Sequence, residues 1–436
     1  MSERLFGLLR DGLEQEAPVS IRVNDASAWR VVGGEPVPWC SGGYYLPGRP
    51  AFTFDPLLHA GCYYVQEASS MFLDHVVKFI TRHAASLHND ARVLDLCAAP
   101  GGKSTILASA LTEGGVLVSN EPVAKRARIL SENMQKWWLK GLTPHAASQH
   151  GAPVVTNNFA RDFKKAKMVF DLILCDVPCS GEGMFRKNVN AIGEWSLANV
   201  KKCQQLQREI VADIWLCLKT GGYMVYSTCT FNVHENEENV AWVADELGAE
   251  VIEIPVEREW NITGALTGKH PVCRFIPGVS RGEGLFMALL RKSKNKGEMS
   301  EERGERFSNR ISEKRTDKRG TPRPCMLMEN DTLSSLLSHS SSLNLRVVPN
   351  DFLDACRAVD AAPLYSLSYG QAVAYLRGEA LVLDPETRRG IVPVGYQGHL
   401  LGLVKNIGNR ANNLYPKEWR IKSTFIPECQ EIIKEI

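Results

Sequence analysis

Two cysteines, Cys179 and Cys229, stand in surroundings that are unusual for core residues. Cys179 lies in the run Asp176-Val-Pro-Cys-Ser-Gly-Glu-Gly183, and Cys229 lies in Ser227-Thr-Cys-Thr230. Each run directly follows a short apolar segment. A buried cysteine is usually an inert core residue, but two cysteines on loops at one edge of a sheet are harder to explain as packing.

Such a pair suits one demanding reaction, the methylation of carbon 5 of a cytosine. Carbon 5 is a poor nucleophile until a thiolate adds to carbon 6 and makes carbon 5 enamine-like. A proton must later leave and the thiol must be eliminated, so two cysteines and an acid near the ring nitrogen can supply this chemistry. Methylation of an amino group needs no thiolate. Enzymes of that kind often carry Asp/Asn-Pro-Pro-aromatic on this loop, and here Cys179 takes the aromatic position.

A third run, Cys97-Ala-Ala-Pro-Gly-Gly-Lys103, follows the apolar segment Arg92–Leu96 and opens a predicted helix. Small residues at a strand-to-helix turn let the backbone approach a ligand, and a helix N-terminus favours negative charge. Gly102-Lys103-Ser104 matches the end of a phosphate-binding P-loop, but that motif requires glycine where Cys97 stands. The nucleoside-triphosphatase interpretation therefore fails, and a packing turn is the alternative to a ligand loop.

Glu121 ends the next predicted strand, about twenty residues after the glycines. A carboxylate at this place can accept hydrogen bonds from two ribose hydroxyls; the alternative is an acid that interacts with a helix dipole. Together the two features indicate a cofactor that contains a nucleoside. They leave open a dinucleotide or S-adenosylmethionine, although the Gly-x-Gly-x-x-Gly spacing of dinucleotide sites is absent.

The order of the predicted elements explains why these runs should meet. Strands are predicted at 92–96, 116–119, 154–156, 171–175, 223–226, 251–254 and 285–290, and helices at 104–111, 121–139, 197–218 and 234–247. This alternation predicts a parallel α/β sheet with helices on both faces. Ligands of such sheets bind at the carboxyl ends of the strands, where all the runs described above are located.

Composition supports a globular intracellular protein. Hydrophobic residues make up 44% of the 436 residues, charged residues 23%, and the net charge is +2, which excludes a mainly disordered chain. The sequence contains neither an apolar run long enough to cross a membrane nor a signal peptide. Twelve cysteines in a long chain without an export signal indicate a reduced cytosol. No Cys-x-x-Cys pair occurs, so we expect no metal site of the zinc-ribbon type.

Charge distribution divides the chain. The stretch 291–325 is rich in Lys and Arg, with a charge of about +6 up to Pro324, and contains few large apolar residues. We interpret it as a flexible basic linker, either a solvated spacer or an electrostatic tether for nucleic acid. The predicted units are an N-terminal segment (1–90), a catalytic domain (91–290), the linker and a C-terminal domain (326–436).

The three runs, in this order and spacing, resemble the Sun-type (NSUN) RNA cytosine-5 methyltransferases. Tyr64-Val-Gln-Glu-Ala-Ser-Ser-Met71 and the tail Gly402-Leu-Val-Lys-Asn-Ile-Gly-Asn-Arg-Ala-Asn-Asn-Leu-Tyr-Pro416 extend the similarity to the bacterial RsmF-like branch. The resemblance covers nearly the whole chain except the linker. It implies 5-methylcytosine formation in RNA, with 16S rRNA of the small ribosomal subunit as substrate and transfer RNA as the alternative.

The resemblance also implies a Rossmann-like class I methyltransferase domain that uses S-adenosyl-L-methionine. The cofactor-binding residues would be Cys97, Ala98, Ala99, Pro100, Gly101, Gly102, Lys103, Glu121 and Asp176. Cys229 would be the nucleophile, Cys179 would assist product release, and Asp176 would hydrogen-bond the cytosine, with Lys103 helping to position the base. DNA cytosine methyltransferases use a Pro-Cys nucleophile instead, so this order of roles rests on the resemblance.

The sequence departs from the family pattern at a few positions. Val177 replaces the usual alanine. The acid that meets the adenine in relatives aligns with Phe159, so Asn158, Phe159 and Asp162 all remain candidates. Gly278 stands where relatives commonly have His or Gln, and the run 281–284 is expected to be a turn that enters a strand.

The flanking units resemble RNA-facing modules. In the N-terminal segment a strand is expected at 18–24 with Arg22 and Asn24 on one face, while Tyr44, Tyr45, Tyr63 and Tyr64 either pack or stack on bases. The C-terminal unit resembles a small PUA-like RNA-binding domain, in which Lys405, Arg410, Lys417 and Arg420 alternate with Tyr415 and Trp419; a structural cap is the alternative. We expect a cytosolic monomer with no membrane partner, and the competing function is a non-catalytic ribosome-assembly factor.

Overall fold

The computed structural model describes residues 1–84, 90–112, 114–140, 153–293, 345–359, 362–423 and 425–436. Most of the predicted basic linker, from residue 294 to 325, lies outside these ranges. The first two linker residues belong to a strand, because β13 continues through Lys292 and buries its side chain. The central sheet therefore extends two residues into the stretch interpreted as linker.

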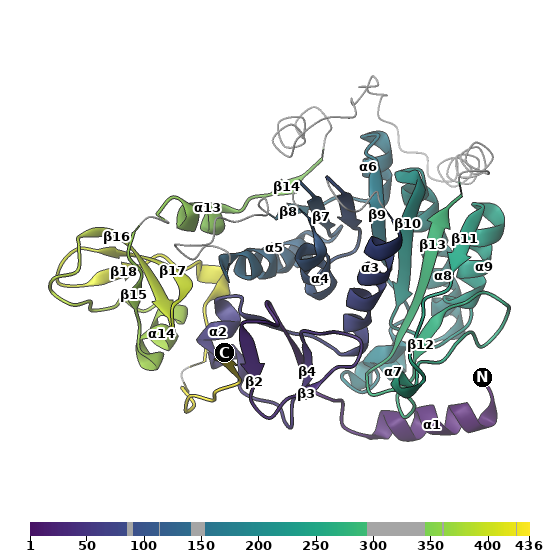
Figure 1. Ribbon diagram of the computed structural model, residues 1–436, viewed down its shortest axis with the longest axis horizontal. Helices are drawn as coiled ribbons and strands as arrows, with labels where there is room; N and C mark the ends of the chain where they lie inside the picture. The colour runs from purple at the N-terminus through teal and green to yellow at the C-terminus, as the bar shows by residue number, and fades with distance from the viewer. Residues whose placement is uncertain (85–89, 113, 141–152, 294–344, 360–361, 424) are drawn as a thin grey trace.

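A nine-stranded sheet forms the centre of the molecule, in the order β11-β13-β10-β9-β6-β7-β8-β14, with β12 paired to β13 (Figure 1). Its strands are β6 (Arg92–Asp95), β7 (Val116–Asn120), β8 (Val154–Thr156), β9 (Phe170–Asp176), β10 (Leu218–Thr228), β11 (Ala249–Ile252), β12 (Cys273–Phe275), β13 (Leu285–Lys292) and β14 (Val347–Val348). All the strands predicted from the sequence form, although several bounds shift by a few residues.

The sheet is only partly parallel, which corrects the prediction of a parallel sheet. Strands β6 to β10 are parallel, whereas β13 runs antiparallel to both β10 and β11. Phe286, near the start of β13, pairs with Thr228 at the carboxyl end of β10. A strand that enters the sheet at that edge must run back along its neighbour.

Helices cover both faces of the sheet, as predicted. They are α3 (Phe72–His83), α4 (Gly102–Ala110), α5 (Ala124–Leu139), α6 (Ala160–Lys165), α8 (Leu197–Trp215) and α9 (Glu237–Glu246). The short helix α7 (Val189–Glu194) belongs to the connection between β9 and α8. One core lies under α3, α4 and α5 and another under α6, α8 and α9. Alternate residues of β9 serve the two cores: Leu172 packs in the first and Ile173 in the second, as the two-residue period of a strand requires.

One helix begins later than predicted. Helix α5 starts at Ala124 and not at Glu121, because Pro122 disfavours helical backbone at the residue before it. Glu121 is thereby left in the turn between β7 and α5, at the carboxyl edge of the sheet.

The N-terminal segment contains a four-stranded antiparallel sheet, in the order β3-β4-β1-β5. Its elements, with β2 placed outside this sheet, are α1 (Glu3–Glu14), β1 (Ser20–Val23), β2 (Trp29–Val31), β3 (Glu35–Pro36), β4 (Gly43–Tyr45), α2 (Pro56–His59) and β5 (Tyr63–Val65). Arg22 is buried; it donates to Gln66 and Thr105 and lies over the Trp137 ring. This segment is thus bound tightly to the central domain.

Several residues considered for RNA contact are internal instead. Tyr45 and Tyr63 are buried, and Asn24 donates to backbone carbonyls of Gly61 and Trp137. In the C-terminal domain Tyr415 is also buried. Stacking of a base on these three tyrosines is therefore wrong as an expectation, since their rings already fill the core.

The C-terminal domain contains α13 (Asp351–Arg357), α14 (Tyr369–Leu376) and the sheet β15 (Tyr365–Ser366), β16 (Gly390–Tyr396), β17 (His399–Asn406) and β18 (Ala411–Asn413). It is joined to the rest at three places. Strand β14 extends the central sheet beside β8, β19 (Ile433–Glu435) pairs with β2, and one hydrophobic cluster contains residues of both terminal units. Figure 1 shows the N-terminal segment beside both the central domain and the C-terminal domain.

Candidate active site

The four strand ends named by the sequence meet at one edge of the sheet. Strands β6, β7, β9 and β10 are consecutive or near neighbours in the parallel part, so the loops after them converge. They bring together the glycine-rich run, Glu121, the Cys179 loop and the Cys229 loop. All catalytic candidates from the sequence, Cys229, Cys179, Asp176 and Lys103, lie within this cluster.

The two candidate cysteines are in direct contact. Their sulfur atoms are 3.3 Å apart, and both thiols are free and half-buried. The loops that carry them are held together by the backbone: Gly183 N donates to the Cys229 carbonyl oxygen at 2.7 Å, and Val177 N donates to Ser227 O at 3.1 Å. Residues fifty positions apart are thus fixed as one sulfur pair.

The surroundings assign different protonation tendencies to the two sulfurs. The pKa of Cys229 is lowered by the hydrogen bond from Cys179, with help from the positive charge of Lys103, against burial and Asp176, which oppose it. The pKa of Cys179 is raised well above its usual value by that hydrogen bond, by burial and by nearby Glu235. A thiol at Cys179 that donates to a thiolate at Cys229 is the pattern these neighbours favour.

Asp176 stands beside the sulfur pair at the end of β9. Its Oδ2 accepts from Lys103 Nζ at 2.9 Å, and its Oδ1 accepts from Ser227 Oγ at 2.6 Å. Burial alone would lower the pKa of Lys103, but the charge and hydrogen bond of Asp176 more than offset this and raise it. Lys103 is therefore a fixed ammonium between the glycine-rich helix and the cysteine loops.

Two buried carboxylates brace the cysteine loops, and both were missed as functional residues. Glu182 accepts from the backbone N–H groups of Phe231 and Asn232 and from the Trp195 indole. Glu235 accepts from Ser180 N and from Gln207 Nε2, at 3.0 and 2.7 Å. Glu182 lies inside the Asp176–Gly183 run, which was a usable signal; nothing in the local pattern marks Glu235.

The turn before β13 contacts the segment that follows the Cys179 loop. Arg186 donates to the Gly282 carbonyl, and Lys187 forms an ion pair with Glu283 at 2.6 Å. A Cβ on Gly282 would lie 2.0 Å from Ser69 Oγ, so a side chain at this position would force Ser69 or the turn to shift. Residues 281–284 form the strand-entry turn that the sequence predicts.

The glycine-rich turn has the shape of a ligand cradle. Ala98 N donates to Asn120 O, which ties the turn to the end of β7, and Gly101 adopts a φ of +120° that other residues rarely reach. Ala98 and Ala99 are buried, Cys97 is half-buried, and Pro100 is exposed. Helix α4 begins at Gly102 and points its first N–H groups toward this turn.

Glu121 carries an unsatisfied buried acceptor. The residue is 1% exposed, its Oε1 accepts from Val123 N at 3.0 Å, and its Oε2 has no hydrogen-bond partner. Arg126 approaches that oxygen only to 3.5 Å. A buried carboxylate oxygen without a donor is costly, and vicinal hydroxyls of a ribose would supply the missing donors. The residues present therefore fit a nucleoside-bearing cofactor.

The structure separates the three candidates for an adenine contact. Asn158 uses its side-chain oxygen and nitrogen on the backbone of Arg346. Asp162 accepts from Phe159 N at the start of α6. The Phe159 ring is 55% exposed, with the Arg161 guanidinium over it. Phe159 thus keeps a free ring face, whereas the other two side chains already have backbone partners.

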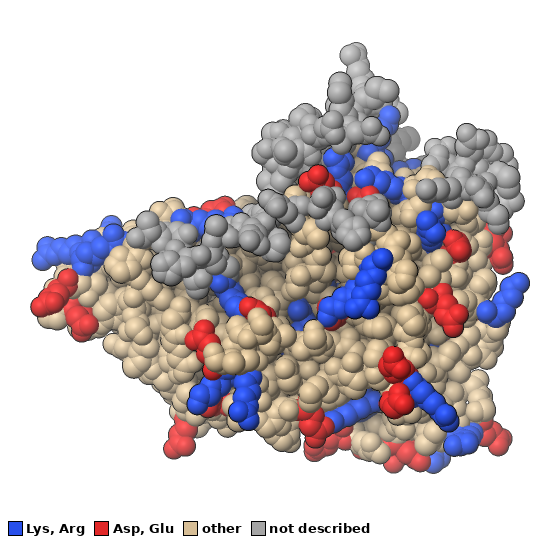
Figure 2. All heavy atoms as spheres, in the orientation of Figure 1, with Lys and Arg blue, Asp and Glu red and all other residues tan. Residues whose placement is uncertain are grey.

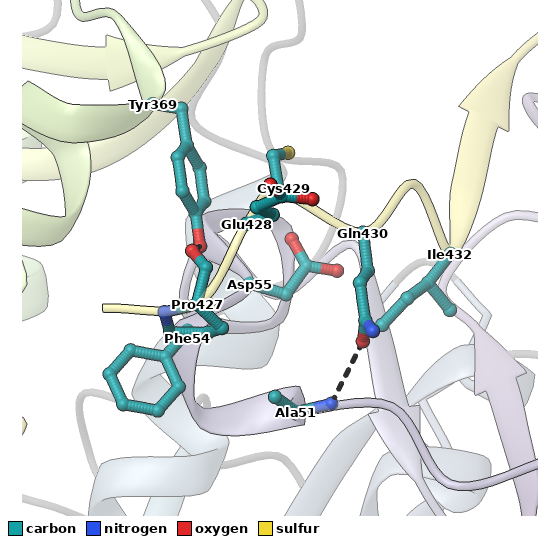
Figure 3. Close-up of a pocket in the computed structure, with 9 residues that line it drawn as sticks. All are labelled: Ala51, Phe54, Asp55, Tyr369, Pro427, Glu428, Cys429, Gln430 and Ile432. Carbon is teal, nitrogen blue, oxygen red and sulfur yellow. Dashed lines mark hydrogen bonds between the residues drawn. The ribbon is translucent and has the colours of Figure 1, made fainter. Parts of the chain in front are cut away.

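A small hollow elsewhere contains none of these residues. It lies between the N-terminal segment and the C-terminal tail and is lined by Asp55, Tyr369, Cys429 and their neighbours (Figure 3). Its volume of about 10 Å³ has room for roughly one water molecule. Within the described ranges, no helix is long and apolar enough to cross a membrane, and no His, Cys, Asp and Glu side chains group as metal ligands.

Three family models match consecutive parts of the chain. The N-terminal domain of 16S rRNA methyltransferase RsmF matches residues 6–68, the 16S rRNA methyltransferase RsmB/F matches 83–291, and the methyltransferase RsmF PUA domain matches 362–421. The PUA assignment confirms the expected class of the C-terminal domain.

Curated relatives agree with these models. The ribosomal RNA small subunit methyltransferase F of Photobacterium profundum is 34% identical over 278 residues, which span 62% of this chain and about half (54%) of that protein. The protein of the same name from Enterobacter sp. (strain 638) is 28% identical over 423 residues, 88% of this chain and 83% of the relative.

Solved structures show the same fold. A methyltransferase homolog protein from Pyrococcus horikoshii is 25% identical, with a TM-score of 0.52 over 65% of this chain and 90% of that one. NSun6 from the same organism has a TM-score of 0.53 at 19% identity, over 66% and 94% of the two chains. With the Rossmann-like sheet and the loops at its edge, the chain belongs to the RsmB/F family of 16S rRNA methyltransferases.

Proposed function

We propose that this protein forms 5-methylcytosine in RNA of the small ribosomal subunit, with S-adenosyl-L-methionine as methyl donor. The observation that carries the proposal is the sulfur pair Cys179–Cys229, 3.3 Å apart and next to Asp176. Two thiols that differ in protonation tendency suit a reaction that needs first a thiolate and then a proton-transfer group. Methylation of an amino group or a ribose hydroxyl uses neither.

The chemistry of the chain's own residues follows from this geometry. Cys229 Sγ would bond to carbon 6 of the cytosine, which moves the electron pair of the 5,6 double bond onto carbon 5. Asp176, oriented by Lys103 and Ser227, would hydrogen-bond the pyrimidine edge. After methylation a base must take the proton from carbon 5. The electron pair left on carbon 5 then re-forms the 5,6 double bond, and the bond from Cys229 Sγ to carbon 6 breaks with release of the thiolate. Cys179 would assist these last steps.

The cofactor, when bound, supplies an electrophilic methyl group. The backbone from Cys97 to Lys103 would hold its methionine part, and Asp176 would stand between it and the base. Glu121 would accept from the ribose hydroxyls through the oxygen that now lacks a donor. The ring face of Phe159 that Arg161 leaves open suits an adenine better than Asn158 or Asp162, whose polar groups have backbone partners.

The substrate assignment rests on the relatives, which are named as ribosomal RNA small subunit methyltransferases. The most direct test measures methyl transfer from labelled S-adenosylmethionine to purified 16S rRNA, to small subunits and to bulk tRNA. Bisulfite sequencing of the products then locates the modified cytosine. We expect one labelled position in 16S rRNA, lost in Cys229→Ala and retained in Cys203→Ala, a matched half-buried cysteine on α8. Label in tRNA alone would select the tRNA alternative, and RNA binding without label would select the assembly factor.

A further inference from the structure

The segment that follows the Cys179 loop exposes an unusual run of apolar side chains. Met184, Ile192, Trp195 and Leu197 are all more than 40% exposed and lie within fourteen residues. Helix α7 packs against the short 3-10 turn Glu182–Met184, so this segment stays beside the cysteine loops. Large exposed apolar groups gathered at one place indicate a contact surface.

Trp195 is the best-defined member of this group. Its indole Nε1 donates to Glu182 Oε1 at 2.9 Å, although the residue is 41% exposed. Its backbone is fixed between the last turn of α7 and Ser196, which caps α8 by accepting from Asn199 N. The ring is therefore held in one orientation with part of its surface open, and it would lose little conformational freedom on binding a ligand.

Glu182 connects this ring to the proposed reaction centre. The same carboxylate that orients Trp195 accepts from Phe231 N and Asn232 N, two and three residues after Cys229. The next residue, Gly183, donates to the carbonyl of Cys229. One buried side chain thus sets the place of an exposed aromatic ring relative to the nucleophile candidate.

We infer that Trp195 is a stacking platform for an unpaired base of the RNA substrate, adjacent to the cytosine that reacts. This inference rests on the proposed function. A base that enters a pocket must leave its stack, and its neighbours then lose a stacking partner. An aromatic ring near the reaction centre replaces that partner, and single-stranded RNA is commonly bound by aromatic stacking together with basic side chains.

The charges around Trp195 fit RNA better than a protein partner. Residues 184–202 contain four basic side chains and one acidic one. Arg186 and Lys187 contact the turn at 282–283 and Lys201 pairs with Glu238, whereas Lys202 on α8 is exposed and available to a phosphate. Trp195 thus offers a ring for stacking, and Lys202, in the helix that follows it, offers an attractive charge for the RNA backbone.

The test compares Trp195→Ala, Trp195→Phe and Trp195→Leu in the full chain without cofactor. The probe is a fluorescently labelled single-stranded RNA of twelve nucleotides. Its affinity for each variant is measured by fluorescence anisotropy across a range of salt concentrations. We expect Trp195→Ala and Trp195→Leu to weaken binding about 5- to 150-fold with an unchanged salt slope, because stacking involves no ion release. Trp195→Phe keeps a ring but loses the hydrogen bond to Glu182 that orients it, so it should bind more weakly than wild type and more tightly than Trp195→Ala.

Two controls separate stacking from other effects. Lys202→Ala should lower the salt slope by about 1, as loss of one phosphate contact does, while Leu206→Ala, a similarly exposed side chain on α8, should change neither quantity. On an abasic ribose-phosphate chain of equal length, wild type and Trp195→Ala should bind equally. Cofactor binding and thermal unfolding show whether each variant is folded.

Several results would overturn the inference. They are equal binding of wild type and Trp195→Ala to the normal RNA, an equal loss on the abasic chain, or a loss in Trp195→Phe as large as in Trp195→Ala. A wild-type dimer that Trp195→Ala dissociates would show that a second copy covers this surface. If wild type methylates RNA and the variants bind normally, only this inference fails; if wild type transfers no methyl group to any RNA, the proposed function fails first.

Discussion

A cysteine becomes useful to catalysis through its neighbours, and Cys179 and Cys229 have different ones. Cys229 lies near the Lys103 ammonium, whereas Cys179 lies near the buried Glu235. Among the eleven described cysteines, burial raises the pKa of Cys356 to about 12, and burial together with the charge of Glu253 raises that of Cys273 to about 12. The candidate nucleophile is thus distinguished by charge and hydrogen bonding, and not by exposure.

The first prediction separates the roles of the two thiols. Cys229→Ala should abolish methyl transfer without loss of cofactor affinity, whereas Cys179→Ala should form the bond to RNA and stall before release. Residues that act in sequence fail at different steps. A protein–RNA band on a denaturing gel should therefore accumulate for Cys179→Ala only. A band trapped only in Cys229→Ala would reverse the roles, and normal turnover of Cys179→Ala would make it a packing residue.

A second prediction concerns the unsatisfied carboxylate of Glu121. Glu121→Ala should weaken binding of S-adenosylmethionine by about 1.5–3 kcal/mol, the scale of hydrogen bonds to a charged group. Isothermal calorimetry measures the change, and Glu250→Ala on the distant edge strand β11 is the control. Unaltered affinity of Glu121→Ala would place the ribose contact on another residue.

At the scale of elements, the distance between the Cys179 and Cys229 loops is set by a glycine. A Cβ on Gly183 would lie 2.5 Å from the Cys229 carbonyl oxygen, which is backbone and cannot turn aside. The two loops approach closely because residue 183 has no side chain.

Gly183→Ala should therefore push the two loops apart. Displacement of reacting groups by about 1 Å can lower a rate about 100-fold, so methyl transfer should fall by a factor of that order. Gly264→Ala is the matched control, because a Cβ there meets no atom within 4 Å. Initial rates at saturating RNA and cofactor measure both variants. Equal rates for Gly183→Ala and wild type would show that the loops adjust without cost.

The sequence predicted the elements and the place of the site better than it predicted their contacts. Apolar runs identified the parallel strands because each is buried on both faces, and the carboxyl-edge rule placed Cys179, Cys229 and Glu121 together. The antiparallel β13 was not foreseen, since strand direction depends on where the chain re-enters the sheet. Glu235 was missed because its donors, Ser180 and Gln207, are brought to it only by the fold.

At the scale of the whole molecule, the two chain ends form one body. The hydrophobic cluster that contains Ile21 and Trp29 of the N-terminal segment also contains Tyr375 and Leu401 of the C-terminal domain. Basic and acidic side chains of the described residues are interspersed over the face shown in Figure 2, so contact with RNA there cannot rely on a single-sign surface. Removal of the C-terminal domain would uncover apolar residues of the N-terminal segment, so exposed residues such as Lys405 and Arg410 are better probes of RNA contact than truncation.

The last prediction tests whether the two terminal units unfold together, by a substitution in β19 of the C-terminal tail. Ile433 in β19 is 1% exposed and pairs with Val31 of β2, whereas Ile436, three residues later, is 79% exposed. Ile433→Ala should cost about 2–5 kcal/mol of unfolding free energy, the range for a buried isoleucine, and Ile436→Ala about 0.5 kcal/mol or less. Urea unfolding followed by circular dichroism and by tryptophan fluorescence should give one transition that Ile433→Ala moves to lower denaturant in both signals. Trp29 of the N-terminal segment belongs to the shared cluster, and Trp419 of the C-terminal domain packs against it. Tryptophan fluorescence should therefore report the loss of tail packing from both units. Two separate transitions, with only the later one moved, would mean that the terminal units fold independently despite their common core.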